Sequence, residues 1–88
     1  MNVEFRKSFE KDLTKLRDEA LLERIKVAIE EVENTENFAD LSNLKKLKAG
    51  GNFYRIRIGD YRIGITIIDD IIVFVRCLHR KEIYRFFP

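Results

Sequence analysis

Residues 53–78 are the part of the sequence that most limits what the chain can fold into. Apolar and polar residues alternate here with a period of two, and β-branched residues dominate, which is typical of strands that bury one face. The pattern is interrupted at Gly59-Asp60, which suits a two-residue type II′ turn with glycine first, and at Asp69-Asp70. It predicts an antiparallel meander with strands at 53–58, 61–68 and 71–78.

The N-terminal half shows a helical period instead. Residues 2–6 alternate and predict a short first strand. Ser8 is a candidate N-cap for a first helix with one apolar face. Asp18 is a candidate N-cap for a second helix, whose apolar residues recur at helical spacing up to Asn34. We interpret both apolar stripes as core rather than as binding sites.

The order of these elements predicts an α+β fold. It consists of a short N-terminal strand, a two-helix hairpin and a three-stranded antiparallel meander packed on the helices, in a single domain spanning residues 1–88. Residues 37–52 are interpreted as a connection that turns at Gly50-Gly51.

Composition excludes several classes of protein. The chain has 88 residues, of which 45% are hydrophobic and 36% charged, so it is expected to fold as a soluble domain. No apolar run reaches the roughly 18 residues of a membrane span, and the N-terminus lacks the apolar stretch of a secretory signal. We therefore expect a cytoplasmic protein with no membrane partner. With one histidine and one cysteine, the chain is expected to need neither a metal nor a cofactor. Cys77 is interpreted as a buried small hydrophobic residue.

Charge is distributed unevenly along the chain. Residues 1–44 hold 7 basic and 11 acidic residues, whereas residues 45–88 hold 10 and 4. A basic half favours a polyanionic partner, nucleic acid first. The lysines Lys45, Lys46 and Lys48 are candidate RNA contacts, although lysines at such positions also simply solvate a surface.

Three arginines in the first predicted hairpin fall on one face of the sheet. A two-residue turn at Gly59-Asp60 pairs Arg57 with Arg62 and Arg55 with Gly64. Like charges opposite each other are destabilising, so this face is expected to be open to water or to bind an anion. Arginine's planar fork matches phosphate, and Gly64 leaves a side-chain-free spot for a substrate. The alternative is a solvated outer face with scattered arginines.

The C-terminal stretch LHRKEIYRFFP adds further polar candidates. His79 is a candidate for proton transfer, and Arg80, Tyr84 and Arg85 follow it. The register of the last hairpin leaves two placements open. A two-residue turn at Asp69-Asp70 puts His79 on the Arg62 face, whereas an extra loop residue or a bend puts Arg80 there.

These stretches resemble the RelE/ParE superfamily of toxins from type II toxin–antitoxin pairs. The resemblance covers most of the chain and is most specific at the GDYR hairpin and the HRKEIY ending. It implies a RelE-like microbial RNase fold. It also implies one of two activities: metal-independent cleavage of mRNA in the ribosomal A site, as in the RelE-like branch, or inhibition of DNA gyrase without nuclease activity, as in the ParE-like branch. A decayed toxin or a plain RNA-binding module is a third alternative.

The resemblance also implies roles for individual residues. Arg55 and Arg57 stand where RelE has two lysines, while Arg62, Arg80 and Tyr84 match its arginines and tyrosine. This set favours the endoribonuclease branch, in which the ribose 2′-OH attacks the adjacent phosphorus and a 2′,3′-cyclic phosphate forms. Because arginine keeps its proton at ordinary pH, either Arg55 and Arg57 act purely electrostatically, or His79 or Tyr84 carries the proton. The candidate catalytic set is Arg55, Arg57, Arg62, Arg80, Tyr84 and His79.

The resemblance implies partners as well. They are a cognate antitoxin that covers the basic face, mRNA on the ribosome, and operator DNA only indirectly through the antitoxin complex. The chain ends at RFFP, which leaves Phe86 and Phe87 as exposed candidates for contact with a partner.

Overall fold

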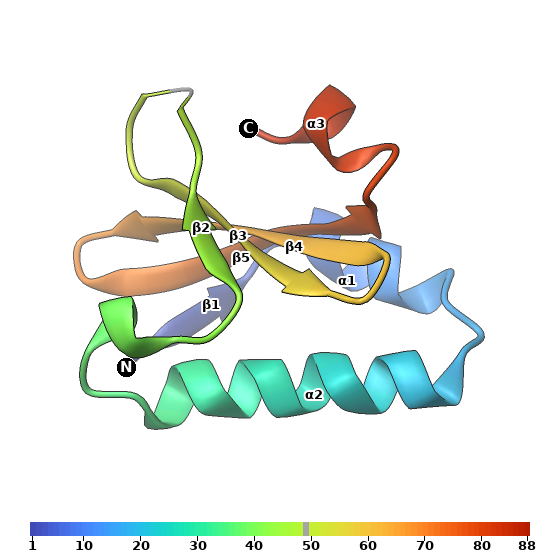
Figure 1. Ribbon diagram of the computed structural model, residues 1–88, viewed down its shortest axis with the longest axis horizontal. Helices are drawn as coiled ribbons and strands as arrows, with labels where there is room; N and C mark the ends of the chain where they lie inside the picture. Colours follow the sequence, from blue (N-terminus) through green and yellow to red (C-terminus); the bar gives the residue numbers. More distant parts are fainter. Residues whose placement is uncertain (49) are drawn as a thin grey trace.

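The structure is a computed structural model that describes residues 1–48 and 50–88. Its elements, in chain order, are β1 (Val3–Phe5), α1 (Lys7–Thr14), α2 (Glu19–Asn34), a 3₁₀ turn (Phe38–Asp40), β2 (Leu44–Lys46), β3 (Phe53–Ile58), β4 (Tyr61–Ile68), β5 (Ile71–His79) and α3 (Ile83–Phe86). The strands form one sheet in the order β1-β5-β4-β3-β2. In Figure 1 the sheet is the middle layer, α2 runs along one side of it, and α3 lies on the other. The predicted α+β fold is confirmed.

The meander follows the predicted boundaries closely. The first two strands match the predicted ranges, and the third runs one residue further, to His79. The second helix begins as predicted, because the Asp18 carboxylate accepts a hydrogen bond from the Leu21 N–H at 3.1 Å. The predicted cap of the first helix is wrong. That helix already begins at Lys7, and the Ser8 hydroxyl instead donates to the Val75 carbonyl at 2.6 Å.

Two edge strands complete the sheet. β1 is the predicted N-terminal strand and pairs parallel with β5, with Val3 opposite Ile72. β2 lies inside the segment that was interpreted as a connection, and it pairs antiparallel with β3, with Lys45 opposite Arg55. At three residues β2 is too short to show an alternating pattern, and only the longer strand beside it makes it a strand.

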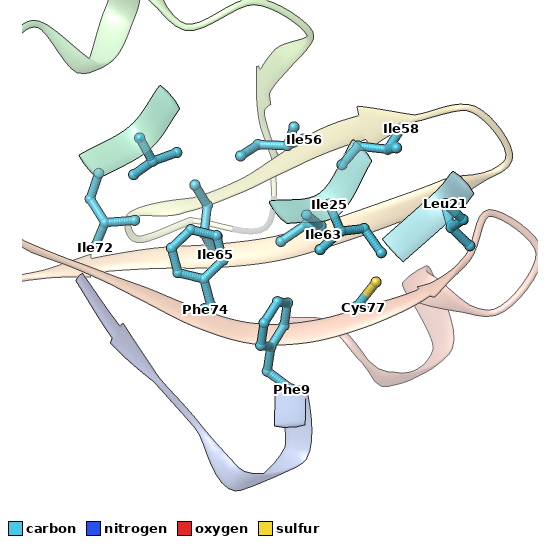
Figure 2. Close-up of a cluster of buried hydrophobic side chains, with 11 residues drawn as sticks. Phe9, Leu21, Ile25, Ile56, Ile58, Ile63, Ile65, Ile72, Phe74 and Cys77 are labelled. Atoms are coloured by element: carbon cyan, nitrogen blue, oxygen red, sulfur yellow. The ribbon is translucent and has the colours of Figure 1, made fainter. Parts of the chain in front are cut away.

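The core lies between the helices and one face of the sheet. Figure 2 shows isoleucines of β3 and β4 packed with Phe74 and Cys77 of β5 against side chains from both helices. Phe9 of α1 and Ile25 of α2 are almost fully buried there. The apolar stripes of the helices are therefore core, as the sequence predicts. Among the described residues, no helix is both long and apolar enough to cross a membrane.

Cys77 is part of this core, with 1% of its surface exposed. Burial, followed by the nearby Asp12 charge, raises the pKa of its thiol to about 12 from 9.0. Because the thiolate is the nucleophile, the folded protein is expected to resist a thiol reagent at pH 8. Labelling with a chromogenic disulfide should proceed only after urea unfolds the chain. Rapid labelling of the folded protein would show that the β5 packing is wrong.

Candidate functional site

The arginine face has the predicted register. Arg57 lies opposite Arg62 in the β3–β4 ladder, and Arg55 lies opposite Gly64. All three arginines therefore project from the side of the sheet that faces away from α1 and α2, since their neighbours in the strands fill the core. Lys45 of β2 lies beside Arg55 and extends this face by one strand.

Arg62 is the electrostatic centre of this face. Burial, followed by the positive charges of Arg55 and Arg57, lowers the pKa of Arg62, whereas the Tyr84 phenol raises it and Arg80 lowers it. The five groups are thus close enough to influence one another. Because four cations repel one another on this face, binding of a negatively charged group such as a phosphate is favourable there.

Local hydrogen bonds orient two of these arginines. One terminal nitrogen of Arg62 donates to the carbonyls of Gly59 and Tyr61, at 2.8 and 2.9 Å. Arg55 donates to the Asn43 carbonyl at 3.3 Å, and its buried Nε has no partner among the described residues. The backbone of the β3–β4 turn therefore fixes the Arg62 fork, while its other nitrogens remain available to an anion.

Arg80 is attached to the same turn. Its backbone N–H donates to the Asp60 carbonyl at 2.7 Å, and its Nε lies 3.7 Å from the Asp60 carboxylate. Both side chains are largely exposed, so this ion pair contributes little to stability and holds the guanidinium only loosely. Tyr84, on α3, is 59% exposed. The structure therefore brings together Arg55, Arg57, Arg62, Arg80 and Tyr84.

His79 is not part of this group. A β-bulge between Gly64 and Ile65 shifts the β4–β5 register by one residue, so that Leu78 lies opposite Arg62 and His79 opposite Tyr61. The imidazole packs edge-on to the Tyr61 ring at 5.5 Å, and its Nδ1 accepts a hydrogen bond from the Lys81 N–H. Of the two placements left open by the sequence, the structure has the one that puts Arg80 with the arginines.

The other basic candidates divide between the two sides of the sheet. Lys46 pairs with Tyr54 on the helical side, where its ammonium lies 6.0 Å from the tyrosine ring. Lys48 is exposed beyond the end of β2. Arg85 is exposed on α3, with its guanidinium 5.8 Å from the Phe86 ring. Lys46 is therefore separated from the arginine face, whereas Lys45 belongs to it.

The predicted open spot at Gly64 is occupied, which corrects the sequence interpretation. A Cβ at Gly64 would lie 2.6 Å from two atoms of the Phe87 ring. Phe87 is 2% exposed and packs edge-on against Phe53 at 5.7 Å, so it is not a free contact for a partner. Phe86 is 52% exposed, as predicted.

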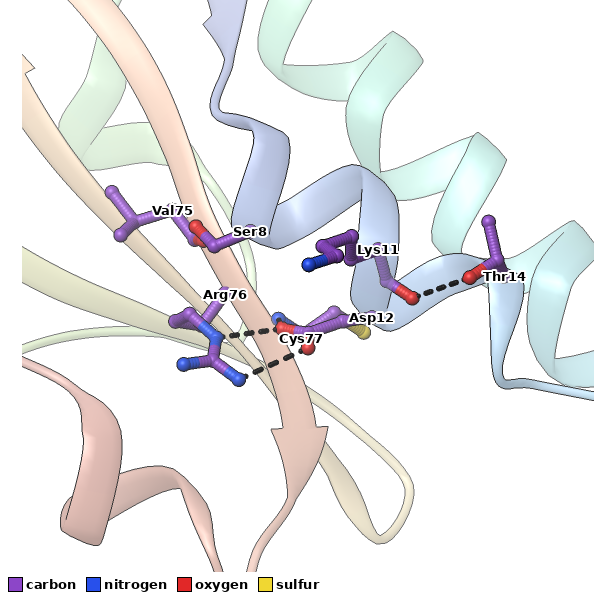
Figure 3. A network of polar contacts seen from close by, with 7 residues as sticks. All are labelled: Ser8, Lys11, Asp12, Thr14, Val75, Arg76 and Cys77. Carbon is purple, nitrogen blue, oxygen red and sulfur yellow. Dashed lines mark hydrogen bonds and ion pairs between the residues drawn. The ribbon is translucent and has the colours of Figure 1, made fainter.

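Asp12 is a buried acidic residue that the sequence interpretation missed. Its carboxylate accepts hydrogen bonds from two nitrogens of Arg76, at 2.8 and 3.0 Å, and from the Cys77 N–H at 2.9 Å. Figure 3 shows this group between α1 and β5, next to the Ser8 contact. A signal existed, since Asp12 follows Phe9 by three residues and thus lies on the apolar face of α1.

No group of three or more potential metal-ligating side chains occurs in residues 1–48 and 50–88. What the site does offer is a set of cations and one aromatic ring on an open sheet face, an arrangement suited to a nucleic acid backbone and a stacked base.

Comparisons with known proteins assign this chain to a class. The sequence model described as the ParE toxin of the type II toxin-antitoxin system parDE matches residues 3–84. Toxin RelE3 of Methanocaldococcus jannaschii is 48% identical over the full length of both chains. The putative toxin RelE1 of the same organism is 33% identical over 92% of this chain and 90% of its own.

Solved structures give the same class. A chain in the crystal structure of the RelB-RelE antitoxin-toxin complex from Methanococcus jannaschii is 45% identical, with a TM-score of 0.81 over 97% of this chain and 99% of that chain. A chain of the archaeal RelE-RelB complex from Pyrococcus horikoshii OT3 is 25% identical, with a TM-score of 0.72 over 90% of this chain and 93% of that chain. The protein is thus a toxin of a type II toxin–antitoxin system. It belongs to the ParE toxin family and is RelE-like within it.

Proposed function

We propose that this toxin is a metal-independent endoribonuclease that cleaves mRNA in the ribosomal A site and so inhibits translation. The observation that supports this most is the grouping of Arg62, Arg80 and Tyr84 on the open face of the sheet, next to Arg55 and Arg57. These are the positions that the resemblance to RelE marks, and they converge although Arg80 and Tyr84 lie outside the β3–β4 hairpin.

The proposed cleavage requires positive charge where negative charge develops in the transition state. The ribose 2′-oxygen attacks the adjacent phosphorus as its proton passes to water. The bond to the 5′-oxygen breaks, that oxygen takes up a proton from water, and a 2′,3′-cyclic phosphate remains on the upstream fragment. The phosphorane oxygens gather charge in the transition state, and Arg62 and Arg80 stabilise them. Arg55 and Arg57 hold the RNA backbone and stabilise the developing 2′-alkoxide.

The proton of the 2′-OH does not go to an arginine, because arginine stays protonated. His79 lies on the other side of the sheet, so of the candidate catalytic residues Tyr84 is the one at the site that is not an arginine. Its ring is exposed, and we assign it first to stacking on a base of the bound codon.

Replacing Tyr84 separates stacking from proton transfer. We expect Tyr84→Ala to lower the cleavage rate about tenfold to a hundredfold, since a stacked base contributes about 1–3 kcal/mol. Tyr84→Phe keeps the ring and is expected to retain most of the rate. Single-turnover cleavage of ribosome-bound mRNA measures both. Equal losses in the two variants would mean that the phenol hydroxyl carries a proton.

We propose the partners that the resemblance to RelE implies: a cognate antitoxin, mRNA on the ribosome, and operator DNA through the antitoxin complex. The archaeal relatives above were solved as antitoxin–toxin complexes. A cognate antitoxin with acidic side chains would neutralise the arginine face and block the site. Operator DNA would be reached through the antitoxin rather than through the toxin.

A second candidate function is inhibition of DNA gyrase, and the observation that favours it is the match to the ParE sequence model. Primer extension on a reporter mRNA after induction, together with a supercoiling assay on purified protein, decides between the two. Cleavage ends within codons, together with unimpaired supercoiling, support the ribonuclease function. Intact mRNA and inhibited gyrase would support the second function.

A further inference from the structure

Gly64 of β4 and Phe87 of the C-terminal segment lie in close contact. Three Phe87 ring atoms lie 2.6, 2.6 and 2.8 Å from where a Gly64 Cβ would stand, so no other residue fits at position 64 unless the ring moves. Gly64 does not have a positive φ, so the left-handed conformation does not require a glycine here, and the close approach of Phe87 does. The ring is 2% exposed and also packs edge-on against Phe53.

The same segment carries Tyr84. The short helix α3 is anchored on both sides of this residue, by Ile83 with 0% exposure and by Phe87. The Phe87 N–H also donates to the Ile83 carbonyl at 2.8 Å, which closes the turn. Tyr84 itself is exposed, so its place over the sheet depends on these two anchors. In the sheet, Gly64 lies between Arg55 of β3 and Arg76 of β5. The contact between Phe87 and Gly64 is therefore next to the arginine face.

We propose that Phe87, seated on Gly64, is a positioning residue that holds Tyr84 beside Arg62 for the reaction. The inference rests on the proposed ribonuclease function. Ile83 alone fixes one end of a single helical turn and leaves the turn free to pivot, whereas the second anchor fixes its orientation. Misplacing a reacting or stacking group by about 1 Å can cost a hundredfold in rate, so loss of the Phe87 contact is expected to slow turnover.

The test uses Gly64→Ala and Phe87→Leu, each made in the wild-type chain and in Tyr84→Ala. In the wild-type chain we expect each to lower kcat about tenfold to a hundredfold, with a smaller change in KM. In the Tyr84→Ala chain neither should lower the rate further, because the group they position is gone. The control is Phe86→Leu, which alters an exposed ring on the same helix and is expected to leave kcat unchanged.

A purely structural role gives a different pattern. Equal losses with and without Tyr84 would overturn the proposal, as would no loss in the wild-type chain.

NMR tests the positioning role of Phe87 without depending on a measurement of ribonuclease activity. The Gly64 α-proton that stands where a Cβ would be should resonate upfield in the wild type, because it points at the Phe87 ring. In Phe87→Leu this shift should disappear and the heteronuclear NOE of the Tyr84 amide should fall. If the wild type cleaves no mRNA, the proposed function fails, and an unchanged Tyr84 NOE would independently overturn the positioning role.

Discussion

Arg62→Ala is expected to lower mRNA cleavage about a hundredfold to a thousandfold, the range found when one group that stabilises transition-state charge is removed. Arg62 lies at the centre of the basic face, where the charges of Arg55, Arg57 and Arg80 all act on it. Growth arrest on induction should disappear with the cleavage. Single-turnover assays on ribosome-bound mRNA measure the rate directly.

The same variant is expected to keep its stability. Arg62 lies directly opposite Arg57, and like charges across a ladder are destabilising, so removing one relieves repulsion. The hydrogen bonds lost are to the carbonyls of Gly59 and Tyr61 at the turn, which water can replace. Urea unfolding should therefore show a free energy of unfolding within about 1 kcal/mol of the wild type.

The matched control is Lys26→Ala. It also removes one positive charge, but from the exposed surface of α2, the helix on the other side of the sheet. It is expected to cleave as the wild type does. If Arg62→Ala remains fully toxic, or Lys26→Ala loses as much activity, the site assignment is wrong.

Asp12→Ala is expected to have the largest effect on stability, about 3 kcal/mol of the free energy of unfolding, because breaking a buried pair leaves its partner uncompensated. The Asp12 side chain is 3% exposed, whereas that of Arg76 is 23% exposed and recovers some solvent. The variant also strips the Cys77 N–H of its acceptor at the edge of β5. Urea unfolding followed by circular dichroism measures the change.

Glu10→Ala is the control for this prediction. Glu10 is an exposed acidic residue on the same helix, so its loss is expected to change stability by less than about 0.5 kcal/mol. A similarly small change in Asp12→Ala would contradict the role assigned to the Asp12 carboxylate.

The sequence predicted most where its pattern is local. The two-residue turn at Gly59-Asp60 and the alternation on either side determine the β3–β4 register, so the shared face of Arg55, Arg57 and Arg62 follows from period and turn length alone. The cap at Asp18 is local in the same way.

The rest depends on contacts that no local pattern records. The bulge at Gly64/Ile65 decides the face of His79, and it lies inside β4 rather than at a turn, so the alternation on either side does not determine the register across it. Ser8 looks like a cap, but its hydroxyl finds the Val75 carbonyl across the molecule. Phe87 looks like an exposed tail residue, and only the glycine on the neighbouring strand gives it a place to bury.

The proposed reaction is tested most directly by primer extension on two reporter mRNAs in a purified translation system, one natural and one with a 2′-O-methyl group at a mapped cleavage site. The account predicts a cut within the A-site codon of the natural mRNA and none at the modified nucleotide, because the 2′-oxygen is the attacking group. Equal cutting of both mRNAs would contradict the proposed attack by the 2′-oxygen, and no cutting of either would contradict the ribonuclease function itself.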